Sequence, residues 1–198
     1  MRLKIYVISN EMDDEAGDDD WPSWIAEEKI AEPWKDLRWL AWLDAHPYPT
    51  SASASASAPP LKFYCAALIR PHLYIGDCTY NEAFLNQEKI EVIIDCTIEL
   101  VPKYSGYEYH KLHMDDTSRT NITEPLKTGL TIITNAILAE KNVLVHCAQG
   151  ISRSPTIVIH YLMKTFGLSM EKALAEVRSK WDRASPNKGF LKYLALQC

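Results

Sequence analysis

The sequence predicts an α/β fold over residues 61–198, with a mostly parallel central sheet flanked by helices. Two observations predict it. Short apolar runs rich in Val and Ile alternate along the chain with stretches whose apolar residues recur at helical spacing, which is typical of α/β proteins. The run "IEVIIDCT" at 90–97 is apolar enough to be buried on both faces, as expected of a strand covered by helices on both sides.

An acidic extension precedes this domain. Residues 1–60 hold twelve acidic and five basic side chains, whereas residues 61–198 hold fourteen acidic and sixteen basic ones, within a total net charge of −5. The small-residue repeat "TSASASASAPP" at 50–60 cannot bury apolar area and predicts a flexible linker. We therefore expect an acidic, Trp-rich N-terminal extension at 1–49, a Ser/Ala/Pro linker, and one folded domain.

The extension contains an acidic run, "EMDDEAGDDD", and five of the six tryptophans of the chain. The acidic run lacks the ligand spacing and the final glutamate of an EF-hand, so we expect a solvated loop. Pro33 favours the start of a helix, and Trp34, Leu37 and Ala41 follow at helical spacing. Two interpretations remain open: this helix packs its aromatic face on the main domain, or it binds a partner protein.

The composition also bears on where the protein acts. No apolar stretch approaches the roughly 20 residues that span a bilayer, and the first residues are too short an apolar run for a signal peptide. The five cysteines have no CxxC spacing, which argues against a zinc site and against a disulfide framework. The histidines are scattered too. We expect a cytoplasmic and/or nuclear protein without a metal, a cofactor or a membrane partner.

The first half of the domain is predicted to contain three strands and two helices. The strands lie at 72–76, 90–97 and 107–114, and a short helix with Asn81 as its N-cap joins the first two. A long amphipathic helix follows, for which Thr123 is the expected cap.

The second half continues the alternation. A buried strand at 142–146 leads to a helix at 155–166, which Gly167 is expected to end. Two shorter helices, which begin after Ser169 and after Asn187, close the chain.

The segment "VHCAQGISRSPT" at 145–156 joins the buried strand to the helix. Ligands bind at such strand ends in open α/β sheets. Gly150 lets the turn curl so that backbone N–H groups face inward and bind an anion. Ser154 is the expected N-cap and Pro155 the first helical residue, so the positive end of the helix points into the loop. Arg153 adds a planar fork that matches two phosphate oxygens.

The loop N–H groups, the helix N-terminus and Arg153 create a positive potential at Cys147. This potential favours the thiolate, which is the nucleophilic form of cysteine. The segment therefore predicts a loop that both binds a phosphate group and attacks it. The residues expected to bind the phosphate are Ala148, Gln149, Gly150, Ile151, Ser152 and Arg153.

Residues 61–198 resemble the dual-specificity phosphatases of the cysteine-dependent protein tyrosine phosphatase superfamily. "HCAQGISRSPT" fits their His-Cys-five-Arg-Ser signature, "YLMKTFGLSMEKALAEVRSK" is similar to the helices after it, and "ASPNKGF" to their closing segment. "PHLYIGD" and "IIDCT" resemble their early strands, although Asp95 stands where we expect asparagine. The resemblance implies a metal-independent hydrolase that dephosphorylates proteins through a phosphocysteine intermediate on Cys147.

The resemblance also implies roles for residues around the nucleophile. In "HMDDTSRT" it assigns the general acid to Asp116; the alternative is that Asp115 and Asp116 merely cap the loop. Ser154 would hydrogen-bond the sulfur of Cys147 and help it to leave, in addition to capping the helix. His146 would be a buried, orienting imidazole rather than a general base.

Some phosphatases of this superfamily protect the nucleophile with a disulfide to a cysteine on the neighbouring strand. The resemblance makes Cys96, at the end of "EVIIDC", the candidate redox partner of Cys147. The alternative is that Cys96 is an ordinary small buried residue.

The expected substrate is a phosphoprotein that carries phosphotyrosine and phosphoserine or phosphothreonine. One alternative is the same chemistry on a non-protein phosphate, such as an RNA 5′ end or a phosphoinositide, but no further Lys or Arg lies between Cys147 and Arg153 to bind a polyanion. Another is a phosphosubstrate-binding scaffold with little turnover, although the nucleophile, the arginine and a candidate acid are all present. No nucleic-acid partner is expected.

Overall fold

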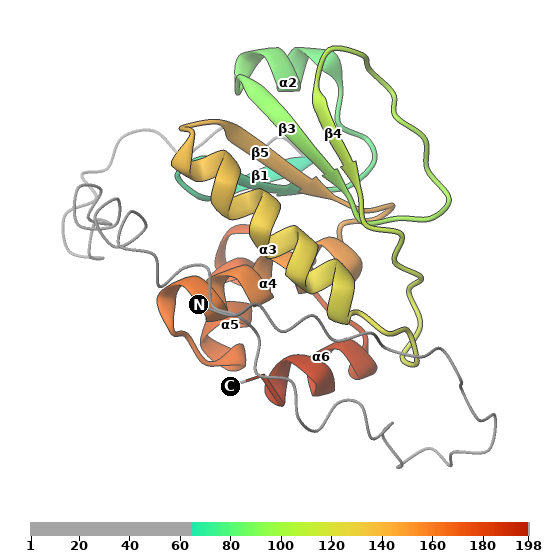
Figure 1. Cartoon of the computed structure of the whole chain (residues 1–198), viewed down its shortest axis with the longest axis vertical. Helices are drawn as coiled ribbons and strands as arrows, with labels where there is room; N and C mark the ends of the chain where they lie inside the picture. Colours follow the sequence, from blue (N-terminus) through green and yellow to red (C-terminus); the bar gives the residue numbers. More distant parts are fainter. Residues whose placement is uncertain (1–64, 198) are drawn as a thin grey trace, which may run out of the picture. The chain divides into compact units, whose positions relative to one another are not determined.

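The computed structural model describes residues 65–197, whose five strands form one mixed sheet (Figure 1). The strands are β1 (Ala66–Arg70), β2 (Leu73–Gly76), β3 (Ile90–Asp95), β4 (Glu108–Lys111) and β5 (Asn142–His146). Their order across the sheet is β1-β2-β5-β3-β4, with β1 antiparallel to β2 and every other pair parallel. The predicted α/β class and mostly parallel sheet are therefore confirmed, whereas the predicted extension, linker and Trp-rich helix lie outside the described residues.

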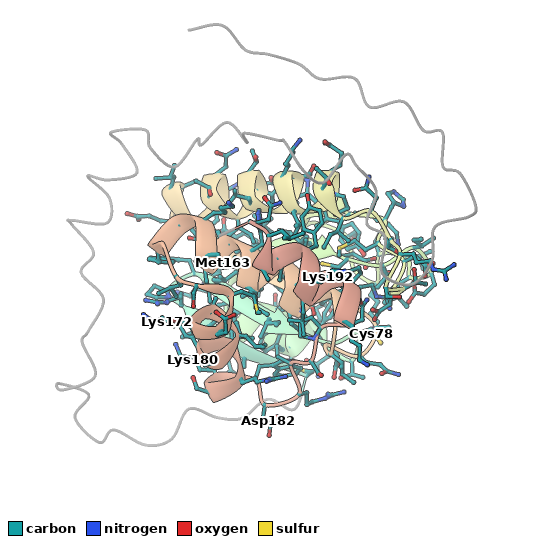
Figure 2. All side chains as sticks on the ribbon, turned by 90° about the horizontal axis from the view of Figure 1, so that it is seen from below. Cys78, Met163, Lys172, Lys180, Asp182 and Lys192 are labelled. Carbon is teal, nitrogen blue, oxygen red and sulfur yellow. The ribbon has the colours of Figure 1, made fainter. Side chains whose placement is uncertain are left out.

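Helices cover both faces of the sheet (Figure 1). One face carries the short α2 (Glu82–Gln87), and the other carries α3 (Thr123–Leu138), α4 (Arg153–Phe166), α5 (Met170–Lys180) and α6 (Lys188–Ala195). In Figure 2 the helices of this thicker layer lie in front of the sheet, with Met163 of α4 and Lys192 of α6 labelled. Within residues 65–197, no helix is both long enough and apolar enough to cross a membrane.

Side chains alternate between the two faces of the sheet. Phe84 and Leu85 of α2 pack with Tyr74, Ile93 and Leu144 in one apolar cluster. The opposite face of the strands meets α4, which also contacts α3, α5 and α6. Twelve of the fourteen residues of α4 are buried, because the helix has neighbours on nearly every side. The helix that carries the predicted phosphate-binding arginine is thus the centre of its layer.

Most of the predicted helix ends are confirmed. Asn81, Ser169 and Asn187 each accept a hydrogen bond from a backbone N–H three residues ahead, and Gly167 ends α4 in the left-handed conformation with φ of +62°. Thr123 is not the cap of α3, however, because Ile122 occupies that position and Thr123 is already helical. The Thr123 hydroxyl does not cap α3 but bonds to the Tyr193 hydroxyl (2.8 Å), which joins α3 to α6.

Two strands also differ from the prediction. The strand expected at 107–114 is limited to β4, since His113 turns the chain with a positive φ of +43°. No sequence pattern predicted β1, an edge strand with a break in its register between Leu68 and Arg70.

His160 of α4 gives the fold a pH dependence. Its side chain is almost fully buried, and neither ring nitrogen has a hydrogen-bond partner within the described part of the chain. Burial lowers its pKa to about 3, with Lys164 one turn ahead adding to the effect. Because the unfolded chain has a histidine pKa of about 6.5, the unfolded state takes up a proton first as the pH falls.

We therefore expect the free energy of unfolding to be highest above pH 6.5 and to fall by up to about 1.4 kcal/mol per pH unit below it for this histidine. Urea denaturation at pH 7.5 and pH 5.5 measures the slope. His160→Leu removes one titrating group and should make the slope shallower, while the buried His146, whose pKa is lowered to about 4, keeps part of it. An equally steep slope in the variant would show that other groups cause the acid sensitivity.

Candidate active site

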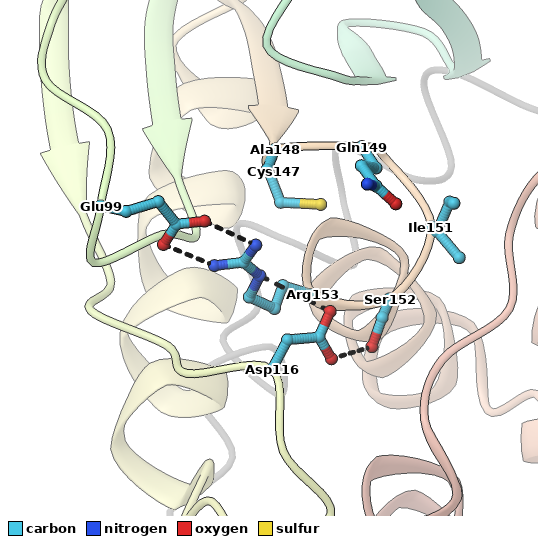
Figure 3. A pocket seen from close by; sticks show the side chains of 8 residues that line it. All are labelled: Glu99, Asp116, Cys147, Ala148, Gln149, Ile151, Ser152 and Arg153. Atoms are coloured by element: carbon cyan, nitrogen blue, oxygen red, sulfur yellow. Dashed lines mark hydrogen bonds and ion pairs between the residues drawn. The ribbon is translucent and has the colours of Figure 1, made fainter.

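The loop of residues 147–152 leaves the end of β5 and enters α4, at the edge of the sheet where parallel strands end. A pocket of about 330 Å³ opens there (Figure 3), at the lower end of the size range of small-molecule sites. Its lining residues are Glu99, Asp116, Cys147, Ala148, Gln149, Ile151, Ser152 and Arg153. All of these except Glu99 were predicted as site residues, and the fold brings them together from three segments of the chain.

Residues outside the loop orient its peptide groups through hydrogen bonds. Three of its carbonyl oxygens accept hydrogen bonds from surrounding residues. The pairs are Cys78 N to Ala148 O (3.3 Å), Trp181 Nε1 to Gly150 O (2.6 Å) and Ser185 N to Ile151 O (2.7 Å). In a trans peptide the N–H that follows a carbonyl points the opposite way. The N–H groups of Gln149, Ile151 and Ser152 therefore point inward, where they form a set of donors suited to an anion.

Cys147 lines the same pocket and is 2% exposed. Its Sγ accepts hydrogen bonds from Gly150 N (3.2 Å) and from Ser154 Oγ (3.3 Å). Two donors thus hold the sulfur in the pocket. The contact expected between Ser154 and the sulfur is present in the structure.

The capping role predicted for Ser154 is wrong. α4 begins at Arg153 with Ser152 at the N-cap position, and Ser152 makes no side-chain capping bond. Ser154 is helical, and its hydroxyl is turned toward the sulfur and toward Gly76 O (3.3 Å) instead of toward the helix end. Pro155 is accordingly the third helical residue, which is tolerated because the N–H groups of the first turn have no partner within the helix.

The guanidinium of Arg153 forms a double ion pair with Glu99 (Figure 3). Nη1 donates to Glu99 Oε2 (2.9 Å) and Nη2 to Oε1 (2.8 Å), while Nη1 also lies 3.3 Å from Met114 O. Hydrogen bonds from Arg153 lower the pKa of Glu99 to about 2. Nothing in "TIELV" distinguished Glu99 in the sequence, because its partner lies 54 residues away.

The carboxylate of Asp116 is held at the opposite end of the pocket. Its Oδ1 accepts hydrogen bonds from Ser152 Oγ (2.6 Å) and Asn187 Nδ2 (2.9 Å). Its Oδ2 lies 3.7 Å from Arg153 Nε, which is an ion-pair distance but too long for a hydrogen bond. Asp115 is exposed and does not line the pocket. Asn187 was predicted only as a helix cap, and its side chain fulfils that role and holds Asp116 as well.

His146 and Asp95 lie beneath the loop and are buried. Burial lowers the pKa of His146 to about 4, so the imidazole is neutral near pH 7. Burial alone would raise the pKa of Asp95, but hydrogen bonds from Thr97 N (2.9 Å), Tyr109 OH (2.7 Å) and Lys111 Nζ (3.1 Å) hold it below its ordinary value. The three bonds stabilise a charged aspartate at this position, where the resemblance led us to expect asparagine.

Cys96 occupies a position beside the nucleophile. Asp95 and His146 are paired at the ends of β3 and β5, so Cys96 and Cys147 directly follow two adjacent strands. Both thiols are free, and burial raises the pKa of Cys96 well above its ordinary value. Among residues 65–197, no three His, Cys, Asp or Glu side chains are grouped to hold a metal ion.

Comparison with known proteins gives consistent similarities. Residues 73–197 match the sequence profile described as "Dual specificity phosphatase, catalytic domain". "Dual specificity protein phosphatase 1B" of Arabidopsis thaliana is 36% identical over 129 residues, which cover 64% of this chain and 77% of that protein. Human "Protein phosphatase Slingshot homolog 1" is 32% identical over 133 residues, or 65% of this chain and 13% of that longer protein. The crystal structure of DUSP15 has a TM-score of 0.63 and 30% identity, covering 66% of this chain and 85% of that one.

Two glycines provide a matched test of the loop. Gly150 and Gly167 both have left-handed φ values, +67° and +62°. A Cβ at Gly150 would lie 2.7 Å from the Trp181 ring and 3.1 Å from Gly76 O, whereas a Cβ at Gly167 would meet nothing within 4 Å.

We expect Gly167→Ala to lower the free energy of unfolding by about 1 kcal/mol, the cost of a left-handed alanine, without altering the affinity for inorganic phosphate. Gly150→Ala should weaken that affinity by about tenfold or more, because the loop or the indole must move. Calorimetric titration with phosphate and urea denaturation measure the two effects. Equal phosphate affinities in both variants would contradict the proposed shape of the loop.

Proposed function

The chain belongs to the dual specificity phosphatase family, and we propose that this protein phosphatase acts through a phosphocysteine intermediate on Cys147. Its substrates are phosphoproteins, and it is a phosphoric monoester hydrolase of the tyrosine/serine/threonine class. The observation that carries the mechanism is the convergence of one sulfur, inward-pointing N–H groups, Arg153 and Asp116 in a single pocket. Each supplies a different part of a phosphoryl transfer.

In the first step, the loop N–H groups and Arg153 bind the phosphate oxygens, and the Cys147 thiolate attacks phosphorus. A P–S bond forms as the P–O bond to the substrate side chain breaks. Asp116 gives its proton to the departing oxygen, which leaves as a neutral hydroxyl. The bonds from Ser152 and Asn187 support this role because they fix the carboxyl group at the pocket edge.

In the second step, water attacks the phosphorus of phosphocysteine, and Asp116 takes a proton from that water. The P–S bond breaks, and inorganic phosphate is released. Ser154 Oγ and Gly150 N already bond to the sulfur, so they stabilise the departing thiolate. His146 directly precedes the loop and supports it, since its neutral, buried ring packs edge-on against the Tyr80 ring, with 4.8 Å between the ring centroids.

The alternatives have less support. A polyanionic substrate such as a phosphoinositide or an RNA 5′ end would favour further cations in the loop, but none of residues 148–152 is basic. A scaffold without turnover would not need a positioned acid beside the nucleophile. Partner binding through residues 1–49 and a cytoplasmic or nuclear location remain proposals that rest on the sequence; the extension lies outside the described residues.

A substrate panel tests the proposed activity. We expect the purified full chain to release phosphate from phosphotyrosyl and phosphothreonyl peptides faster than from a phosphoinositide or from 5′-triphosphorylated RNA. Cys147→Ser should abolish release while still binding phosphopeptide, because it keeps the loop and Arg153. Preferential hydrolysis of the lipid or the RNA would refute the choice of substrate, and an active serine variant would refute the nucleophile.

Asp116→Asn tests the general acid. We expect turnover to fall by about 10²–10⁴-fold on substrates with a poorly acidic leaving group, the usual contribution of a general acid. The loss should shrink for aryl phosphates whose leaving group needs no proton. Asp115→Asn is the matched control, because this neighbour is exposed away from the pocket. A larger loss in Asp115→Asn would exchange the two assignments.

We also propose that Cys96 protects the nucleophile. Hydrogen peroxide oxidises the Cys147 thiolate to sulfenic acid and leaves hydroxide; the Cys96 thiol then forms the disulfide and releases water. Peptide mapping after mild peroxide should give a Cys96–Cys147 link, and Cys96→Ser should recover less activity than wild type after thiol treatment. Full recovery of the serine variant would remove the protective role.

A further inference from the structure

Glu99 lies in the connection after β3, and its carboxylate forms the double ion pair with Arg153. We infer that Glu99 is a positioning residue of the phosphatase reaction, which turns the guanidinium of Arg153 so that one edge faces the phosphate. The inference rests on the function proposed above and adds a residue that neither the local sequence nor the loop motif indicated. It follows from counting the donors of the guanidinium.

A guanidinium has five N–H groups: one on Nε, two on Nη1 and two on Nη2. Glu99 takes one from Nη1 and one from Nη2, and Met114 O takes the second of Nη1 (3.3 Å). The remaining two, on Nε and Nη2, lie side by side on one edge. Nε is buried and has no hydrogen-bond partner in the part of the chain that the structure describes.

This remaining edge is the pair of donors that binds two oxygens of a phosphate. In Figure 3 the guanidinium of Arg153 lies between Glu99 on one side and the loop with Ile151 and Ser152 on the other. The carboxylate therefore contacts the guanidinium from the side away from the loop. Asp116 lies 3.7 Å from Nε, on the side of the guanidinium that faces the pocket.

The contacts also explain why a second residue is needed. Arg153 has three rotatable bonds beyond Cβ before its guanidinium, and the helix fixes only its backbone. Glu99 and Met114 O together fix the plane of the group, and the N–H of Ile98 holds the Glu99 carboxylate (3.1 Å). The low pKa of Glu99, about 2, keeps the pair charged at every pH at which the protein is assayed. The orientation of the free edge is then set before the substrate arrives.

A competing interpretation makes the opposite prediction. If Glu99 occupied the phosphate site, the carboxylate would compete with the substrate and its removal would strengthen phosphate binding. If Glu99 positions Arg153, its removal frees the guanidinium to rotate and weakens phosphate binding. The sign of the change in affinity distinguishes the two.

The experiment compares Glu99→Ala and Glu99→Gln with wild type and with Glu91→Gln, an exposed glutamate near the other end of β3 that removes the same charge. Hydrolysis of a small aryl phosphate gives kcat and KM, and calorimetric titration gives the affinity for inorganic phosphate. We expect Glu99→Ala to raise KM and weaken phosphate binding by about tenfold or more, as for other losses of substrate positioning.

Glu99→Gln keeps one acceptor oxygen and should give a smaller loss, while Glu91→Gln should behave as wild type. The melting temperature is measured alongside. The Arg153 side chain is only 9% exposed, so Glu99→Ala should lower the melting temperature, and Glu99→Gln, which keeps an acceptor for the guanidinium, should lower it less. Unchanged or stronger phosphate binding in Glu99→Ala would overturn the inference. A wild-type chain that does not hydrolyse the aryl phosphate would instead refute the proposed function, and phosphate titration would still decide the role of Glu99.

Discussion

The hydrogen bond from Trp181 Nε1 to Gly150 O (2.6 Å) orients the peptide groups of the loop of residues 147–152, and the pocket depends on this orientation. Because the indole binds the Gly150 carbonyl on the side away from the pocket, the N–H of Ile151 points into the pocket. A reversed peptide would present its carbonyl oxygen to an anion and repel it. The arrangement requires the left-handed φ of Gly150 and the absence of a side chain there, because the indole packs against that position. The indole follows α5, so a residue 31 positions away shapes the site.

The residues in and around the pocket come from the rigid helix α4 and from three loops. α4 is buried among its neighbours and carries Arg153 and Ser154 in its first turn, beside the sulfur. The connection after β3 supplies Glu99, the one after β4 supplies Asp116, and the one before α6 supplies Asn187. Loops positioned by a rigid scaffold are the usual place for binding and catalytic residues, and here each loop residue is tied to α4 or to its N-cap.

The sequence predicted those parts that local chemistry decides. Helix caps bond three residues ahead, so they were predictable from short patterns. The loop of residues 147–152 is one contiguous segment, and its role in binding phosphate stays a prediction. The capping role of Ser154 was wrong because a nearby sulfur and a distant carbonyl offered its hydroxyl other partners. Glu99 and the second role of Asn187 were missed because their partners lie 54 and 71 residues away. The catalytic role of Asp116 stays a prediction, although the fold brings its carboxylate to the pocket.

We propose that the phosphoryl group of the substrate is transferred to the sulfur of Cys147. Trapping the resulting phosphocysteine tests this step most directly. Ser154→Ala removes a donor to the sulfur, so the second step should slow and phosphocysteine should accumulate. Mixing this variant with an aryl phosphate, quenching with denaturant within the first turnover and mapping peptides by mass spectrometry locates the phosphoryl group. We expect a single phosphoryl group on Cys147 and a burst of the aryl alcohol equal to the enzyme concentration. A burst with the phosphoryl group on another residue, or phosphate release without any modified peptide, would contradict it.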